Sequence, residues 1–231
     1  MTLIGNLPAL KKEYPVVKIV MGLGNPKRAL IAAGIHGNEP AGVHALFAFL
    51  QKKHYRRFIT NWELTFLPCI NPSGYELGTR ENYENIDLNR KFRAKSPPLE
   101  VKFVKTVFNK PYDMTLELHE DIDSPGYYLY QTMDSKKKTT FGHQILNRVK
   151  DVIPINMNAT IEEMQAEGGV IKASVDPKKM KWWPMAIYSM AKGTQYFLTL
   201  ETPTMFPMKT RVAAHLLAID SALANFKRKR Q

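Results

Sequence analysis

The sequence is poor in cysteine and has no long apolar run. Cys69 is the only cysteine among 231 residues, which excludes an intramolecular disulfide and a cysteine-based zinc site. No stretch approaches the roughly 20 apolar residues that cross a bilayer. The N-terminus, MTLIGNLPALKKEYP, lacks the apolar core of a secretory signal. These absences predict a protein of the reducing cytoplasm that has no membrane partner.

Basic residues outnumber acidic ones, and the formal net charge is +12. A basic surface attracts polyanions whatever its fold, and the tail FKRKRQ concentrates some of this charge. No nucleic-acid-binding motif accompanies it. We therefore interpret the tail as a solvated helix end, and we do not expect nucleic acid to be the main partner.

The length and the 44% hydrophobic content suit one domain that spans residues 1–231. Short apolar runs alternate with amphipathic ones, which is typical of an α/β protein. Strands are expected at 16–23, 29–35, 62–70, 113–119, 126–132 and 194–202, and helices at 41–53, 98–109, 139–152 and 208–229.

Two segments do not fit this alternation. Residues 71–97 are polar and rich in turn formers, and loops of that length are usually functional or disordered. Residues 153–193 contain prolines and the pair Trp182-Trp183, so we expect irregular structure or a lid there. The tryptophans could close over a substrate, although packing is the more common role of such aromatics.

Candidate metal ligands lie where predicted strands end. His36 and Glu39 form an H-x-x-E motif after the strand at 29–35, and His119 ends the strand at 113–119. In open α/β sheets, ligands bind beyond the carboxyl ends of the strands, so these residues can converge. Two histidines and a carboxylate can hold zinc and leave one position for water.

Further polar residues could complete a hydrolytic site. Glu201 lies in an apolar strand, where an ionised carboxylate is costly unless it is paired, so it is a candidate proton acceptor with a raised pKa. Arg80 could stabilise an oxyanion, and Asn89 with Arg90 could hold a substrate carboxylate. Asp87 could either fix the tautomer of a metal-bound histidine or serve as a turn residue.

The segments HGNE, NPSGYELGTREN…IDLNR, LELH and LTLETP together resemble the zinc metallocarboxypeptidase family, the carboxypeptidase A-like group. The central stretch is most similar to bacterial murein peptide amidases, and it also resembles the succinylglutamate desuccinylase/aspartoacylase branch. The resemblance extends from about residue 29 to the final helix. It implies a three-layer α/β/α sandwich around a mixed, largely eight-stranded sheet.

The resemblance also implies a role for each motif residue. One Zn²⁺ would be bound by His36, Glu39 and His119, and Asp87 would orient His36. Glu201 would be the general base and then the general acid. Arg80 would polarise the scissile carbonyl, and the substrate carboxylate would be bound by Asn89 and Arg90. Two positions depart from the pattern. Ser73 replaces the family's aspartate in NPDG, and the mobile substrate-binding tyrosine has Tyr188 as its candidate.

The predicted function is zinc-dependent hydrolysis of an amide bond next to a free carboxylate. A metallocarboxypeptidase or a small-peptide (murein peptide) amidase is the first interpretation. An N-acyl amino acid deacylase is an alternative within the hydrolases. An inactive basic protein that binds nucleic acid on the same scaffold is an alternative from another class.

Overall fold

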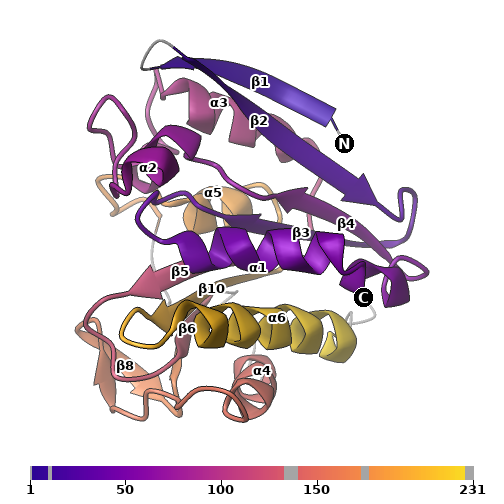
Figure 1. Cartoon of the computed structure of the whole chain (residues 1–231), viewed down its shortest axis with the longest axis vertical. Coiled ribbons are helices and arrows are strands. Elements are labelled where there is room, and N and C mark those ends of the chain that lie inside the picture. Colours follow the sequence, from indigo (N-terminus) through magenta and orange to yellow (C-terminus); the bar gives the residue numbers. More distant parts are fainter. Residues whose placement is uncertain (1, 10–11, 133–139, 173–176, 227–231) are drawn as a thin grey trace.

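A mixed sheet of ten strands forms the centre of the protein, in the order β1-β2-β4-β3-β5-β10-β6-β9-β8-β7 (Figure 1). The computed structural model describes residues 2–9, 12–132, 140–172 and 177–226. The strands are β1 (Thr2–Ala9), β2 (Lys12–Met21), β3 (Lys27–Ala33), β4 (Trp62–Leu67), β5 (Met114–Asp121), β6 (Tyr128–Thr132), β7 (Thr160–Ile161), β8 (Met164–Glu167), β9 (Val170–Ile171) and β10 (Tyr196–Pro203).

The middle of the sheet is parallel. Strand β3 pairs in parallel with β4 and β5, and β5 pairs in parallel with β10, whereas β2 runs antiparallel to β4 and β6 runs antiparallel to β10. The carboxyl ends of β3, β5 and β10 therefore meet at one edge. The register of the β5–β10 pair places Glu201 directly beside His119, so the two side chains share one face of the sheet.

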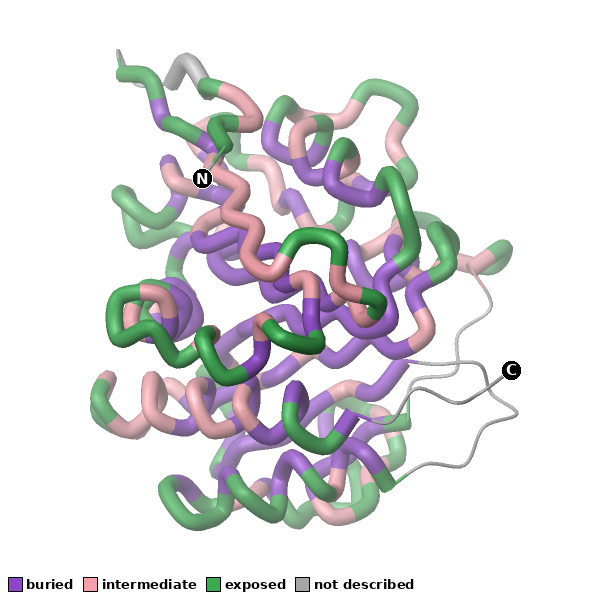
Figure 2. The backbone as a smooth tube through the Cα atoms, turned by 90° about the vertical axis from the view of Figure 1, so that its right-hand side faces the viewer, coloured by how far each residue is buried: buried purple, intermediate pink, exposed green. Residues whose placement is uncertain are grey.

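Helices cover both faces of the sheet. Helices α1 (Pro40–Gln51), α4 (Phe141–Val149) and α6 (Met208–Asn225) pack on one face, and α3 (Leu99–Val107) and α5 (Met185–Ala191) pack on the other. Strand β3 shows why. Its residues Ala29, Ile31 and Ala33 join the first core cluster, and the alternate Leu30 and Ala32 join the second. Buried backbone accordingly runs through the middle of the molecule (Figure 2).

This architecture confirms the predicted three-layer α/β/α sandwich, but the sheet has ten strands where eight were expected. Strand β1 contains Gly5, Asn6 and Pro8, which interrupt any apolar alternation. Strands β7 and β9 have only two residues each, which is too short for a periodic pattern. The segment 153–193 thus contributes three strands and helix α5.

The long polar loop also has short regular pieces. It contains α2 (Pro72–Leu77) and the 3-10 turn η2 (Leu88–Arg90), and a second 3-10 turn, η1 (His54–Arg57), follows α1. Within the described ranges, no helix is both long and apolar enough to span a membrane. The basic tail at 227–231 lies outside the described residues.

Candidate metal centre

The turn after β3 carries two of the candidate ligands and packs against the loop at 71–80. The backbone N–H of Gly37 donates to the carbonyl oxygen of Arg80 at 3.4 Å. A Cβ on Gly37 would lie 1.9 Å from the carbonyl carbon of Gly74. Only glycine permits this approach. The turn then leads to Glu39, and Pro40 starts α1 directly after it, at the first position of a helix where proline is favoured.

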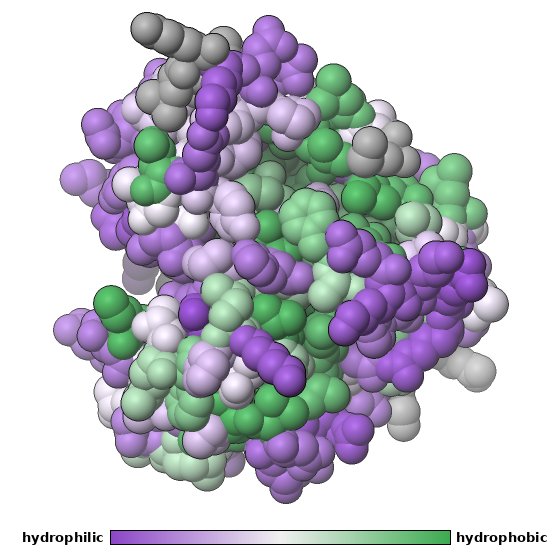
Figure 3. All heavy atoms as spheres, viewed as in Figure 1, coloured by the Kyte–Doolittle hydropathy of each residue, from purple (hydrophilic) through white to green (hydrophobic). Residues whose placement is uncertain are grey.

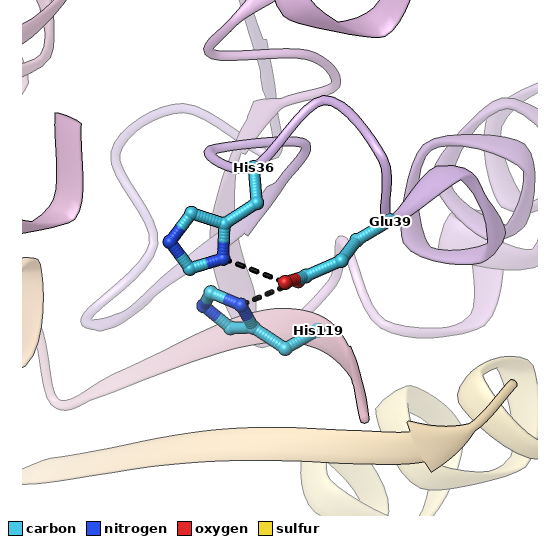
Figure 4. A group of neighbouring side chains, drawn as sticks. All are labelled: His36, Glu39 and His119. Atoms are coloured by element: carbon cyan, nitrogen blue, oxygen red, sulfur yellow. Dashed lines mark hydrogen bonds and ion pairs between the residues drawn. The ribbon is translucent and has the colours of Figure 1, made fainter. Parts of the chain in front are cut away.

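His36, Glu39 and His119 converge on one point (Figure 4). The Nδ1 atom of His36 lies 2.7 Å from one carboxylate oxygen of Glu39, and the Nδ1 atom of His119 lies 2.7 Å from the other. One ligand atom from each residue lies within 4.8 Å of the others, and all three residues are buried. Two imidazole nitrogens and one carboxylate form a donor set that suits zinc.

The far side of each histidine ring faces a second carboxylate. Asp87 Oδ1 lies 3.5 Å from Nε2 of His36, and Glu117 Oε1 lies 3.4 Å from Nε2 of His119. Both Nε2 atoms and Glu117 Oε1 are buried without a hydrogen bond of standard geometry. Carboxylates behind metal-binding histidines fix the tautomer and orientation of the ring. The arrangement therefore fits a bound metal held on the Nδ1 side.

The sequence analysis did not identify Glu117. Glu117 lies two residues before His119 in an apolar strand. Residues two positions apart in a strand point to the same face, so this spacing was the available signal. Glu120 has a different role. Its carboxylate accepts the backbone N–H of Ala41 at 2.6 Å and pairs with Arg211, so it ties α1 and α6 to β5.

Electrostatics within the cluster depend on burial and on its mixed charges. Burial alone would raise the pKa of Glu39, but the neighbouring His119 and His36 hold it well below its usual range. Burial would lower the pKa of His119, but Glu39 and Glu117 raise it well above its ordinary value. Burial also works against the charge of Asp87, yet His36 and Arg80 lower its pKa to about 2.

Glu201 lies beside His119 in register, and burial raises its pKa to about 8. His119 acts in the opposite direction, and the nearby carboxylates of Glu39, Asp121 and Glu117 add to the increase. The pKa of the Glu201 carboxyl group therefore lies close to neutral pH.

Arg80 and Arg90 of the polar loop both pair with Asp87, which faces His36. Arg80 Nη1 lies 3.6 Å from Glu39 Oε1, and Arg80 Nη2 donates to Asp87 Oδ2 at 3.2 Å. Arg90 Nε lies 3.1 Å from the same Asp87 oxygen. Asn89 accepts the backbone N–H of Met185 through Oδ1 at 2.8 Å, so its amide N–H groups are the donors that it offers to a ligand. Arg80 thus lies beside the candidate metal centre, and Arg90 is joined to it through Asp87.

Tyr188 lies elsewhere. It belongs to α5, and its partly buried ring packs against the second core cluster, 5.6 Å from the rings of both Phe92 and Phe108. The ammonium groups of Lys105 and Lys192 lie over the ring at 5.1 and 5.5 Å. None of these contacts joins it to the histidine pair. The contacts of Tyr188 are packing and cation–π contacts, and its substrate-binding role stays a prediction.

His215 on α6 lies directly behind the centre. It contacts the backbone oxygen of His119 through Nε2 at 3.2 Å and the hydroxyl of Tyr127 through Nδ1 at 3.0 Å. Burial lowers the pKa of His215 to about 3. It is therefore neutral and supports the β5 backbone from the α6 side.

The centre lies at the edge of the sheet where β5 and β10 end. In the space-filling view the surface is hollowed on its left side, level with the carboxyl end of β5 in Figure 1 (Figure 3). A mixed sheet between two helix layers, with a His-Glu-His group at its carboxyl edge, places a possible metal site where ligands bind in open α/β sheets. The chain belongs to the succinylglutamate desuccinylase/aspartoacylase catalytic domain family, whose sequence profile matches residues 25–201.

Solved structures agree with this fold. A protein assigned as a metallopeptidase from Shewanella amazonensis SB2B is 22% identical, with a TM-score of 0.81, and the match covers 96% of this chain and 85% of that one. A metallo-carboxypeptidase from Burkholderia cenocepacia is 17% identical, with a TM-score of 0.69, and the match covers 96% of this chain and 63% of that one.

A third similar structure is the tripeptide-bound cell shape determinant protein Csd4 from Helicobacter pylori. It is 19% identical, with a TM-score of 0.63, and the match covers 94% of this chain and 57% of that one. No curated protein sequence matches the chain. The family match and the fold confirm the resemblance inferred from the motifs.

Proposed function

We propose that the protein is a zinc-dependent hydrolase that cleaves an amide bond next to a free carboxylate. The observation that carries this proposal is the convergence of His36 and His119 on the two oxygens of Glu39. The second carboxylates, Asp87 and Glu117, support the assignment because each faces the outer nitrogen of one histidine. Zinc held by these three ligands would supply a Lewis acid for the scissile carbonyl and for the attacking water.

Glu201 is the general base and then the general acid in this proposal. It accepts the proton of the attacking water and later delivers it to the leaving amine. A carboxylate whose pKa is raised to about 8 accepts a proton more readily than an ordinary glutamate does. The adjacent His119 keeps this carboxylate close to the reacting atoms because the two residues are paired in the β5–β10 register.

The guanidinium groups set the position of the substrate. Arg80 lies 3.6 Å from Glu39 Oε1, close enough to the centre for its charge to stabilise a developing oxyanion. Arg90 and the amide N–H groups of Asn89 hold the free carboxylate of the substrate. Because the carboxylate is gripped next to the bond that breaks, the enzyme would act on chain ends or small molecules and not within long chains.

Small peptides are the first substrate class that we propose, as for a metallocarboxypeptidase or a murein peptide amidase. The similarity to a fold that binds a tripeptide in Csd4 is consistent with this choice. The family match over residues 25–201 favours a second class, N-acyl amino acids. We expect the segment 153–193 to contribute to the choice between them, because its strands extend the sheet beyond β6.

Metal content and substrate class test the proposal together. We expect about one zinc per chain in the wild type and almost none in His119→Ala, by elemental analysis after zinc has been offered to both. The zinc-loaded protein is then given small peptides and N-acyl amino acids. Hydrolysis of peptides alone selects the first class, and hydrolysis of acyl amino acids alone selects the second. A wild type that takes up no zinc would refute the proposal and favour a basic binding protein on this scaffold.

A further inference from the structure

Two segments far apart in the sequence meet beside the candidate metal centre. Residues 88–98 and 177–184 contain seven lysines and arginines and no aspartate or glutamate. The backbone N–H of Phe92 donates to the carbonyl oxygen of Trp183 at 3.3 Å, and Arg93 donates to the carbonyl oxygen of Met180. The two cationic segments are thus held together by the fold, although each repels the other electrostatically.

Most of these cations have no acidic partner. Leaving Lys178 aside, the ion pairs between described residues engage only Arg90 of this group, through Asp87. We call the exposed part the Trp182 surface, and it consists of Arg90, Arg93, Lys95, Lys179, Lys181 and Trp182. Retaining so many like charges on one small surface is unfavourable unless an anion binds there.

Aromatic rings hold two of the cations in place. The guanidinium of Arg90 lies 5.2 Å from the Trp182 ring centre, and that of Arg93 lies 5.7 Å from the Trp183 ring centre. Trp183 is itself fixed because its indole N–H donates to the carbonyl oxygen of Pro177 at 3.0 Å. A guanidinium that stacks on a ring keeps its N–H groups free to bind carboxylates, and less side-chain entropy is lost on binding.

Asp87 and Arg90 link the Trp182 surface to the centre. Asp87 lies 3.5 Å from His36 Nε2 and pairs with Arg90 at 3.1 Å, and Arg90 in turn lies over Trp182 at 5.2 Å. A ligand whose carboxylate is held at Arg90 therefore has the remaining cations next to it. We propose that this surface binds additional anionic groups of the substrate, so that the enzyme prefers acidic peptides. This inference rests on the proposed function.

Single-stranded nucleic acid is the competing polyanion. Proteins that bind it combine basic grooves with several exposed aromatic rings on which bases stack. The Trp182 surface has one aromatic residue, and Arg90 already lies over its ring. Carboxylates need only the guanidinium and ammonium groups, so an acidic peptide fits the surface better.

Binding can be separated from catalysis with a peptide that lacks a free C-terminal carboxylate. We would measure the fluorescence anisotropy of labelled, C-terminally amidated hexaglutamate and hexaglutamine on the zinc-loaded protein. Hexaglutamate should bind with an affinity that falls as salt is added, and hexaglutamine should not bind. The double variant Arg93→Gln/Lys181→Gln should bind hexaglutamate about three- to tenfold more weakly.

The matched control is Lys52→Gln/Arg56→Gln, which removes the same charge from an exposed site at the other end of α1. It should leave hexaglutamate binding unchanged. An equal loss in the control would overturn the proposal, because it would show attraction to net charge alone. Tighter binding of a six-nucleotide thymidylate than of hexaglutamate would also overturn it, in favour of nucleic acid.

Hydrolysis tests whether the surface serves catalysis. Among substrates that share the same scissile bond, a glutamate extension should raise kcat/KM relative to a glutamine extension. The double variant Arg93→Gln/Lys181→Gln should abolish this difference. Its kcat/KM for the unextended substrate should equal that of the wild type. If the unextended substrate is cleaved but the glutamate extension gives no higher kcat/KM than the glutamine extension, this inference is refuted and the proposed function stands. A wild type that binds zinc and hexaglutamate but cleaves nothing would refute both the proposed function and the substrate role of the surface.

Discussion

Glu117 Oε1 lies 3.4 Å from Nε2 of His119, on the side of the ring opposite the Nδ1 atom that faces Glu39. Asp87 stands in the same relation to His36. Each histidine is therefore enclosed between two carboxylates, one that could share a metal with it and one that could fix its tautomer. The pairing makes Glu117 a positioning residue for the candidate metal centre.

Glu117→Gln should weaken zinc binding about 10- to 100-fold, the usual cost of losing a carboxylate behind a ligand histidine. A neutral amide oxygen is a weaker acceptor for the ring N–H than a carboxylate is. Competition with a chromophoric chelator would measure the affinity. Glu63→Gln is the control, because Glu63 is paired with Arg28 on β3 and not with a histidine. Unchanged affinity in Glu117→Gln would remove the positioning role.

Glu201→Gln should retain zinc and lose turnover by about 100- to 10,000-fold, the range that general acid–base catalysis contributes. The amide keeps the shape of the side chain beside His119 but cannot accept the proton of the attacking water. Zinc content and kcat would be measured on the same preparation. Normal turnover with a full complement of zinc would defeat the assignment of Glu201 as the base.

Zinc binding should release protons at neutral pH. In the metal-free protein the pKa of His119 is raised well above its ordinary value, and that of Glu201 is raised to about 8. Metal ligands bind in their deprotonated form. The apparent zinc affinity should therefore rise as the pH is raised through neutrality and His119 loses its proton, and it should fall as the pH is lowered. Calorimetry in two buffers of different ionisation enthalpy measures the protons released, and a heat that is independent of buffer would contradict the expectation.

The motif residues could be found in the sequence because each follows or ends a parallel strand. His36 and His119 lie more than eighty positions apart, yet the β3–β5 pairing brings them together, with ring centres 4.9 Å apart. The convergence follows from chain topology alone, which apolar periodicity reveals. Strands that are too short for a periodic pattern, such as β7 and β9, gave no such signal.

Contacts across the sheet could not be predicted in this way. The role of Glu117 depends on the register and the face of β5, and an acidic residue between two leucines does not by itself indicate what it faces. Tyr188 shows the converse problem. Its amphipathic helix was not visible in the sequence, so its position in the core with Phe92 and Phe108 was not predictable.

Arg90→Ala should raise KM about tenfold and change kcat little, because the guanidinium would hold the substrate carboxylate in the ground state and in the transition state alike. Arg90→Lys should recover only part of this effect, since an ammonium cannot form a bidentate pair with a carboxylate. Steady-state kinetics on one peptide or acyl amino acid would measure both parameters. A fall in kcat with unchanged KM would assign Arg90 to the chemical step and not to substrate binding.

Gly37→Ala should damage both the fold and the metal centre, because the new Cβ would lie 1.9 Å from the carbonyl carbon of Gly74. Such overpacking costs about 1–3 kcal/mol, and the shift needed to relieve it would move the adjacent His36.

The matched control is Gly78→Ala in the same loop. A Cβ there meets no atom within 4 Å, but the φ of +66° strains it, at a cost of about 1–2 kcal/mol. The unfolding temperature and the zinc affinity should both fall in Gly37→Ala, whereas only the unfolding temperature should fall in Gly78→Ala. Equal zinc affinity in the two variants would show that the close contact between the turn and the loop does not hold His36 in place.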